Sequence, residues 1–142
     1  AAAERKLDYT LPGGSQTRII TRMEGRTPVP EKEKIEALAA HQASMAVYLS
    51  AGMLEELSHR LTAGGYPQDT PAAIVCRATW PDQKVCVGTV GTLAQMAKEQ
   101  DISRMAVVLV GEAVAHREYH RSRLYAPDFS TQFRKAKEAG DA

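Results

Sequence analysis

The sequence has 142 residues, the length of a single domain with a core of its own, and 44% of them are hydrophobic, which argues against disorder. Lys and Arg number 18 and Asp and Glu 17, so the formal net charge of +1 provides no overall field that would favour nucleic acid or acidic substrates. No apolar run approaches the ~20 residues of a membrane span, and the first residues lack the apolar core of a signal peptide, so we expect no membrane partner and no nucleic-acid partner.

The first part of the chain begins with a polar stretch and then alternates short strands with helices. Residues 1–16 are polar and are interpreted as a linker from a missing N-terminal domain. Residues 17–21 are β-prone, and Pro30 is suited to the first turn of a helix, where its missing N–H is not needed. Residues 44–49 are mostly apolar, which predicts a buried strand that runs into a turn of small residues.

The second part of the chain continues the alternation. A helix is expected over residues 52–65, where a pair of glycines marks its end, and a buried strand over residues 72–76. Residues 84–87 are predicted to pair back as a hairpin, Thr89 to cap a third helix, and residues 105–110 to form the last core strand. The resulting order, β-α-β-α-β-β-α-β, predicts an α/β layer fold with helices that cover a mixed sheet.

Residues 116–142 differ from the rest of the chain because they combine many Arg and Lys residues with four aromatic residues. We interpret this segment as a basic aromatic tail that docks on the domain or on a second copy. Nucleic-acid binding by the tail is the less favoured alternative, since acidic residues interrupt the basic ones.

Cysteine and histidine provide little support for redox or metal chemistry. Cys76 and Cys86 lie in apolar, strand-like runs and are interpreted as small reduced hydrophobic residues, which fits a cytoplasmic location, rather than as a disulfide or metal site. His116 and His120 have the spacing of two ligands on one helix face, but no third ligand is evident nearby, so we expect no metal site.

Three turns of small residues follow predicted strands, and ligands of open α/β sheets bind where strand carboxyl ends meet such turns. We therefore expect one crevice lined by all three turns. Their residues are Tyr48 and Leu49, then Arg77, Ala78 and Thr79, and last Val110, Gly111 and Glu112.

The loop after the first strand carries two arginines, Arg22 and Arg26, on either side of Gly25. Guanidinium groups at a strand end are well suited to bidentate recognition of carboxylates. We take the two arginines as candidate substrate ligands, and the alternative is an ordinary solvated connection. The sequence has no Walker A, G-x-G-x-x-G or G-x-S-x-G motif, so the catalytic residues stay unknown.

Several longer strings resemble the C-terminal domain of the tetrapyrrole (class III) methylases. They are QTRIITRMEGRTPVP at 16–30, VYLSAG at 47–52, GGYPQDTPAAIV at 64–75 with RATWPDQK at 77–84, and SRLYAPDFS at 122–130. The first and last strings are most similar to the members of the family that act on precorrin-4. The resemblance implies a three-layer αβα domain over residues 17–115, with a mixed, mostly parallel sheet of about five strands.

The resemblance also implies a function. Members of this family transfer a methyl group from S-adenosylmethionine, which leaves as S-adenosylhomocysteine, and the branch resembled here methylates carbon 11 of precorrin-4 or cobalt-precorrin-4 in corrin synthesis. The three turns would then form one wall of the cofactor cleft, and Arg22 and Arg26 would meet substrate carboxylates. The relatives are typically homodimers, and a chain without the N-terminal domain is expected to be inactive alone.

Two alternatives stay open from the sequence. The chain could be a non-catalytic dimerisation or docking domain of a tetrapyrrole enzyme. It could also belong to a sister precorrin methyltransferase that acts on another ring carbon, because the missing domain is expected to influence the choice of carbon.

Overall fold

The structure is a computed structural model, and it describes residues 1–2, 8–11 and 13–115. Every strand and helix expected from the sequence is present within a few residues of its expected bounds. The proposed tail at 116–142, with His116 and His120, lies outside the described residues. The strands are β1 Arg18–Arg22, β2 Ser44–Tyr48, β3 Pro71–Cys76, β4 Lys84–Thr89 and β5 Ala106–Val110. The helices are α1 Ile35–Ala39, α2 Leu54–Gly64 and α3 Leu93–Glu99, with 3-10 turns η2 Glu31–Glu33, η3 Val90–Thr92 and η4 Glu112–Ala115.

The strands form one mixed sheet in the order β1-β2-β5-β3-β4, so the α/β class with a mixed five-stranded sheet is confirmed. The expected excess of parallel pairs is wrong, because only β1 and β2 pair in parallel and the other three pairs are antiparallel. The reason lies in the crossovers. Each helical connection joins two parallel strands, but those through α2 and α3 skip a strand, so antiparallel neighbours result.

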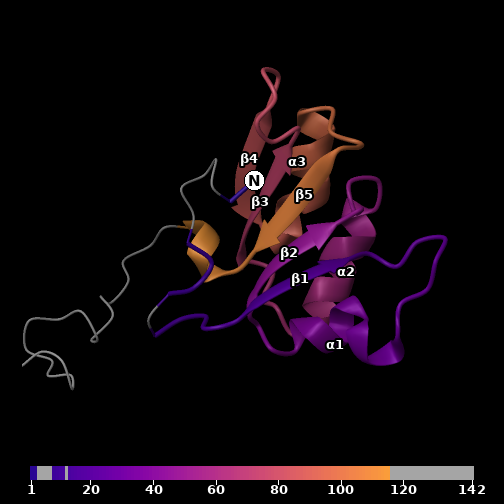
Figure 1. The fold of residues 1–142 in the computed structure, drawn as a ribbon, viewed down its shortest axis with the longest axis vertical. Coiled ribbons are helices and arrows are strands. Elements are labelled where there is room, and N and C mark those ends of the chain that lie inside the picture. Colours follow the sequence, from indigo (N-terminus) through magenta and orange to yellow (C-terminus); the bar gives the residue numbers. More distant parts are fainter. Residues whose placement is uncertain (3–7, 12, 116–142) are drawn as a thin grey trace, which may run out of the picture.

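The three α-helices lie together on one face of the sheet, the far side in Figure 1. Leu57 and Leu61 of α2 are fully buried there with Met45 and Ile74 of the sheet. The opposite face carries the small apolar residues of the central strands and is contacted by η4 and by Tyr9 near the N-terminus. A second layer of α-helices, as the three-layer arrangement requires, is not seen among the described residues.

Helix α2 ends as the sequence predicts. Gly65 follows the helix with a φ of 126°, a left-handed value that glycine adopts without strain. The next residue, Tyr66, is buried and donates its hydroxyl hydrogen bond to the carbonyl of Ala43, and burial raises its pKa to about 12. The end of α2 is thereby fixed to the start of β2.

Strand direction determines which strand ends meet. Strands β1, β2 and β3 run in one direction, and β4 and β5 run in the other. Arg22, Tyr48 and Cys76, the last residues of β1, β2 and β3, therefore lie at one edge of the sheet together with Ala106, the first residue of β5. We call this edge the carboxyl edge. In Figure 1 the loop after β1 and the turn η4 lie at opposite ends of the sheet.

Candidate functional site

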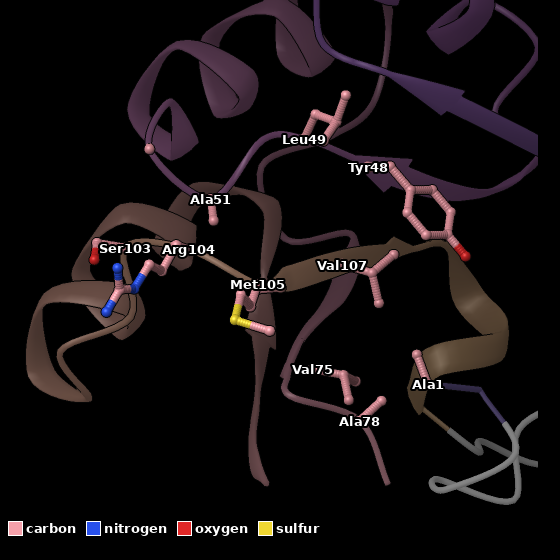
Figure 2. Close-up of a pocket in the computed structure, with 12 residues that line it drawn as sticks. Ala1, Tyr48, Leu49, Ala51, Val75, Ala78, Ser103, Arg104, Met105 and Val107 are labelled. Carbon is pink, nitrogen blue, oxygen red and sulfur yellow. The ribbon is translucent and has the colours of Figure 1, made fainter. Parts of the chain in front are cut away.

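A pocket of about 530 Å³ opens at the carboxyl edge of the sheet. Such a volume lies within the usual range for small-molecule sites. Four segments line the pocket: the end of β2 with the turn into α2, the end of β3 with the turn after it, the segment that enters β5, and Ala1 at the N-terminus. Figure 2 shows side chains from these segments around one hollow. The lining residues are Ala1, Tyr48, Leu49, Ala51, Gly52, Val75, Ala78, Ser103, Arg104, Met105, Ala106 and Val107.

The lining is mainly apolar. Val75 and Val107 form the floor on the sheet, while Leu49 and Met105 stand at the rim with 73% and 51% of their surface exposed. Large apolar side chains this exposed are expected to gain from contact with a ligand or another protein surface. Polar groups in the lining include the side chains of Ser103 and Arg104, which lie at one end of the pocket in Figure 2.

The backbone around this pocket is strained. Leu49, Arg77, Thr79 and Met105 are not glycines, yet their φ values are 53°, 48°, 73° and 54°, in the left-handed region. A side chain in this conformation costs about 1–2 kcal/mol per residue. Strained backbone of this kind clusters at functional sites, where the surrounding structure holds it in place. The strain at the carboxyl edge therefore supports a site there, although Gln42 beside the cavity at the opposite edge has a similar φ of 48°.

Two of the three predicted turns meet at this pocket. Tyr48, Leu49 and Ala78 line it directly. Arg77 lines a neighbouring polar pocket, and Thr79 donates its backbone N–H to the side-chain oxygen of Gln83, 2.7 Å away, inside the turn. The sequence argument for these two turns agrees with the geometry, because β2 and β3 both end at the carboxyl edge.

The third predicted turn lies elsewhere. Val110, Gly111 and Glu112 follow β5, which runs opposite to β2 and β3, so they lie at the other edge of the sheet. The N–H of Gly111 donates to the carbonyl of Pro71 at the start of β3 over 2.9 Å. Gly111 and Glu112 line a separate cavity of about 130 Å³. The expectation that all three turns line one crevice is therefore wrong.

The segment that enters β5 takes the place of that third turn. Residues 103–107 all line the pocket, and sequence reasoning did not select them. The only signal in the sequence was the break between the third helix and the last strand. Because the direction of β5 within the sheet determines which of its ends reaches the pocket, the sequence order alone pointed to the wrong end.

The loop after β1 lies beside this pocket. Met23 is buried, and its N–H donates to the carbonyl of Tyr48 over 3.2 Å. The guanidinium of Arg22 donates to the carbonyls of Met23, Thr27 and Pro28 at 3.1, 3.2 and 3.0 Å. Arg26 is exposed, and it has no hydrogen bond or ion pair within the part of the chain that the structure describes. The two candidate arginines thus have different surroundings.

A further arginine, Arg60, connects this loop to the helical layer. Arg60 on α2 binds Glu36 of α1 through two hydrogen bonds of 2.8 and 3.0 Å. It also lies 3.5 Å from Glu24 in the loop and 3.6 Å from Glu56 on its own helix. These hydrogen bonds lower the pKa of the Glu36 carboxyl below its ordinary value. Arg60 had no place among the sequence-predicted residues, because its partners meet only in the fold.

A smaller polar pocket of about 270 Å³ adjoins the main one and shares Ser103 and Arg104 with it. Its other charged groups are largely engaged, since Arg77 pairs with Asp82 and the Lys84 ammonium donates to the carbonyl of Gln100. Across the described residues no group of three or more His, Cys, Asp or Glu side chains is arranged to hold a metal ion. None of the helices in those residues combines the length and apolarity that crossing a membrane requires.

Comparison with known sequences connects this chain with one family. The model of the family described as Tetrapyrrole (Corrin/Porphyrin) Methylases matches residues 1–94. A cobalt-precorrin-4 C(11)-methyltransferase of Methanocaldococcus jannaschii is 43% identical over 96% of this chain and 52% of its own length. An enzyme of the same name from Priestia megaterium is 40% identical over 95% of this chain and 54% of its own length. The chain thus spans about half the length of these relatives.

Solved structures give the same fold. A cobalt precorrin-4 methyltransferase, described as a cobalamin biosynthetic enzyme, superposes with a TM-score of 0.77 and 39% identity, over 80% of this chain and 47% of that one. A uroporphyrin-III C-methyltransferase of Thermus thermophilus, complexed with S-adenosylhomocysteine, has a TM-score of 0.61 over 78% of this chain and 48% of that one. At 16% identity, that second likeness concerns the fold alone.

Proposed function

This chain belongs to the tetrapyrrole (corrin/porphyrin) methylases, and we propose that it forms part of an enzyme that methylates carbon 11 of precorrin-4 or cobalt-precorrin-4 with S-adenosylmethionine. The observation that carries the proposal is the pocket at the carboxyl edge, in a chain that is 43% identical to an enzyme of that name. That the chain corresponds to the C-terminal half of the longer relatives stays a prediction. The division of the chain into segments 1–16, 17–115 and 116–142 also stays a prediction.

The pocket suits S-adenosylmethionine in size and chemistry. Its volume of about 530 Å³ fits a nucleoside with an attached amino-acid chain. Val75, Val107 and Met105 would hold the flat base between apolar surfaces, and the hydroxyls of Tyr48 and Ser103 are available as polar contacts. A related fold with S-adenosylhomocysteine bound is known in the family, which supports the same ligand here.

The chain's own residues would contribute binding and orientation rather than acid–base chemistry. When bound, S-adenosylmethionine supplies a methyl group on a sulfonium that a nucleophilic ring carbon attacks directly. Such a transfer depends on alignment of the two reactants and on the exclusion of water. The apolar rim of Leu49 and Met105 fits this task, since both side chains stand exposed around the pocket until something covers them.

Arg26 is the residue we propose for the substrate. The precursors of the corrin ring carry several carboxylate side chains. The exposed guanidinium of Arg26 has no partner among the described residues, so it is suited to bind one of them. The loop that carries Arg26 is joined to the pocket through the hydrogen bond from Met23 to Tyr48. A carboxylate held there would lie beside the cofactor site.

We also propose a homodimer in the cytoplasm. Ile20 and Val87, on the two edge strands of the sheet, have 61% and 49% of their surface exposed, which supports a contact with a second copy. Both cysteines are free in the structure, which supports a reducing compartment. Sedimentation velocity of the chain tests the dimer, and a concentration-independent monomer would contradict it.

Titration with S-adenosylhomocysteine in a calorimeter tests the cofactor assignment on this chain directly. We expect measurable binding, and we expect Ala78→Leu, which fills the pocket, to abolish it. Glu112→Gln serves as the matched comparison, because Glu112 lies at the opposite edge and should leave the affinity unchanged. Unchanged affinity in Ala78→Leu together with loss of affinity in Glu112→Gln would mean that the cofactor binds at the other edge of the sheet.

Activity requires a longer assembly, because the chain covers only about half of its relatives. We propose to combine it with the half of the Methanocaldococcus jannaschii relative that it does not cover, and to follow transfer of an isotope-labelled methyl group to precorrin-4. A label at carbon 11, located by NMR, is the expected result. A label at another carbon would favour a sister methyltransferase, and no transfer together with stable association would favour a docking domain.

A further inference from the structure

We propose that Arg22 is a positioning residue: it holds the loop of residues 23–28 in the shape that presents Arg26 to an anionic ligand, and it does not bind that ligand itself. The loop after β1 would then act as a preformed carboxylate subsite with a single guanidinium at its tip. What Arg26 binds rests on the proposed function, whereas the effect of Arg22 on the loop does not.

The first support is the hydrogen bonding of Arg22. Its Nη1 donates to the carbonyls of Met23 and Thr27, and its Nη2 donates to the carbonyl of Pro28. Three of the five donors of this guanidinium are therefore used within the loop. The three carbonyls lie on both arms of the loop, so Arg22 joins its beginning to its end.

The second support is that the first arm of the loop is fixed from two further sides. Met23 has only 1% of its surface exposed, and its N–H donates to the carbonyl of Tyr48 on β2. Glu24 lies 3.5 Å from the guanidinium of Arg60 on α2. Since the first arm is anchored on the sheet and on the helix, the bonds from Arg22 to Thr27 and Pro28 transmit this order to the second arm.

The third support is the contrast with Arg26. Gly25, Arg26 and Thr27 are exposed at the tip, and a Cβ added to Gly25 would meet no atom within 4 Å, so this part of the loop has no packing of its own. The conformation of the tip therefore depends on the contacts that hold the two arms of the loop. Binding a ligand with a loop that is already ordered avoids the entropy that immobilising a flexible loop would require.

Relaxation of the backbone ¹⁵N nuclei tests the positioning role without any ligand. In Arg22→Ala we expect the order parameters of Gly25, Arg26 and Thr27 to fall from the rigid range near ~0.85 to below ~0.6, because three hydrogen bonds that hold the loop are lost. Arg22→Lys should behave like Arg22→Ala, since one ammonium cannot reach all three carbonyls in the fork geometry. Arg18→Ala is the matched control on the same strand, and the order parameters of the loop should not change.

Binding of uroporphyrin, a tetrapyrrole polycarboxylate, tests the consequence for the ligand. We expect Arg26→Ala and Arg22→Ala each to weaken binding severalfold, and the double variant to be no weaker than Arg26→Ala alone. Losses that add in the double variant, or recovery of affinity in Arg22→Lys, would mean that Arg22 contacts the ligand through its charge, and the inference would be wrong.

The two experiments separate this inference from the proposed function. If the unaltered chain does not bind uroporphyrin but Arg22→Ala still lowers the order parameters of the loop, the substrate assignment of Arg26 fails and the positioning role stands. If the order parameters of the loop are the same in Arg22→Ala as in Arg18→Ala, the positioning role fails whether or not uroporphyrin binds.

Discussion

The backbone N–H of Arg77, just after β3, donates a 2.9 Å hydrogen bond to the carbonyl of Met105, just before β5. Both residues have left-handed φ values, 48° and 54°, although neither is a glycine. The bond extends the antiparallel pairing of β3 and β5 by one step beyond Cys76 and Ala106, the last pair of the ladder. It thereby holds two strained turns together at the mouth of the main pocket.

Replacement of Met105 by glycine separates strain from binding. Release of the left-handed strain should offset the greater chain entropy of glycine, so we expect the free energy of unfolding to change by less than about 1 kcal/mol. Affinity for S-adenosylhomocysteine should fall roughly fivefold, because an apolar wall of the pocket is lost. Denaturant unfolding and calorimetry measure the two effects.

The matched control for Met105→Gly is Asp101→Gly. Asp101 has a similar φ of 53° and does not line the main pocket. It should have a similar effect on stability and none on affinity. Equal losses of affinity in both variants would mean that the backbone shape, and not the methionine side chain, determines binding.

Arg60→Ala should destabilise the fold by about 1–3 kcal/mol. The substitution removes two charge-assisted hydrogen bonds to Glu36 and leaves Glu24 and Glu36 without their shared cation. Glu56→Ala is the comparison, because its 3.6 Å pair with Arg60 is an exposed helical pair worth less than about 0.5 kcal/mol. Chemical unfolding of both variants measures the difference, and equal effects would contradict the assigned importance of Glu36.

The Glu36–Arg60 pair also predicts a dependence of stability on pH. Arg60 lowers the pKa of Glu36 in the folded state, so the unfolded chain takes up the proton first as the pH falls. The contribution of the pair is therefore complete above the ordinary pKa of 4.5 and is lost as the pH drops through the lower folded value. Glu36→Gln should be less stable at neutral pH and lose less stability on acidification. Melting temperatures over this acid range measure the effect, and parallel curves would contradict it.

Gly64→Ala should destabilise the fold although alanine favours helices. A Cβ at this position would lie 2.5 Å from the Cβ of Ala39 and 2.6 Å from the carbonyl oxygen of Glu36, so helix α1 would have to move. Overpacking of this kind costs about 1–3 kcal/mol, more than the gain of about 1 kcal/mol in helix propensity. Ala63→Gly on the exposed side of α2 is the control and should lose only about 1 kcal/mol. Stabilisation by Gly64→Ala would show that α1 shifts without penalty.

The sequence determined the local elements of this fold well. The glycine pair at the end of α2 and the unbroken apolar runs of β2, β3 and β5 are properties of neighbouring residues. Their effects depend on backbone conformation and burial close by in the chain. The alternation of strands and helices also correctly indicated an α/β fold with a mixed sheet.

Sheet order depended on the tertiary structure. Strand β5 lies between β2 and β3, and nothing within its own residues 106–110 specifies that position or its direction. Placement of β5 there decides that Met105, and not Gly111, reaches the pocket. For the same reason the sequence correctly grouped Tyr48 with Ala78 and wrongly added the turn that follows β5.

Arg22 and Arg26 show the same division between what the sequence determines and what the tertiary structure determines. Composition and spacing indicated a loop with two guanidiniums at a strand end, but the local sequence could not distinguish them. The fold brings the carbonyls of Thr27 and Pro28 to Arg22 and leaves Arg26 exposed. Residue types and their order were thus enough for the elements and for the candidate positions. The partner of each charged side chain was decided only when distant segments met, because hydrogen bonds and ion pairs depend on distances of a few ångströms across the fold.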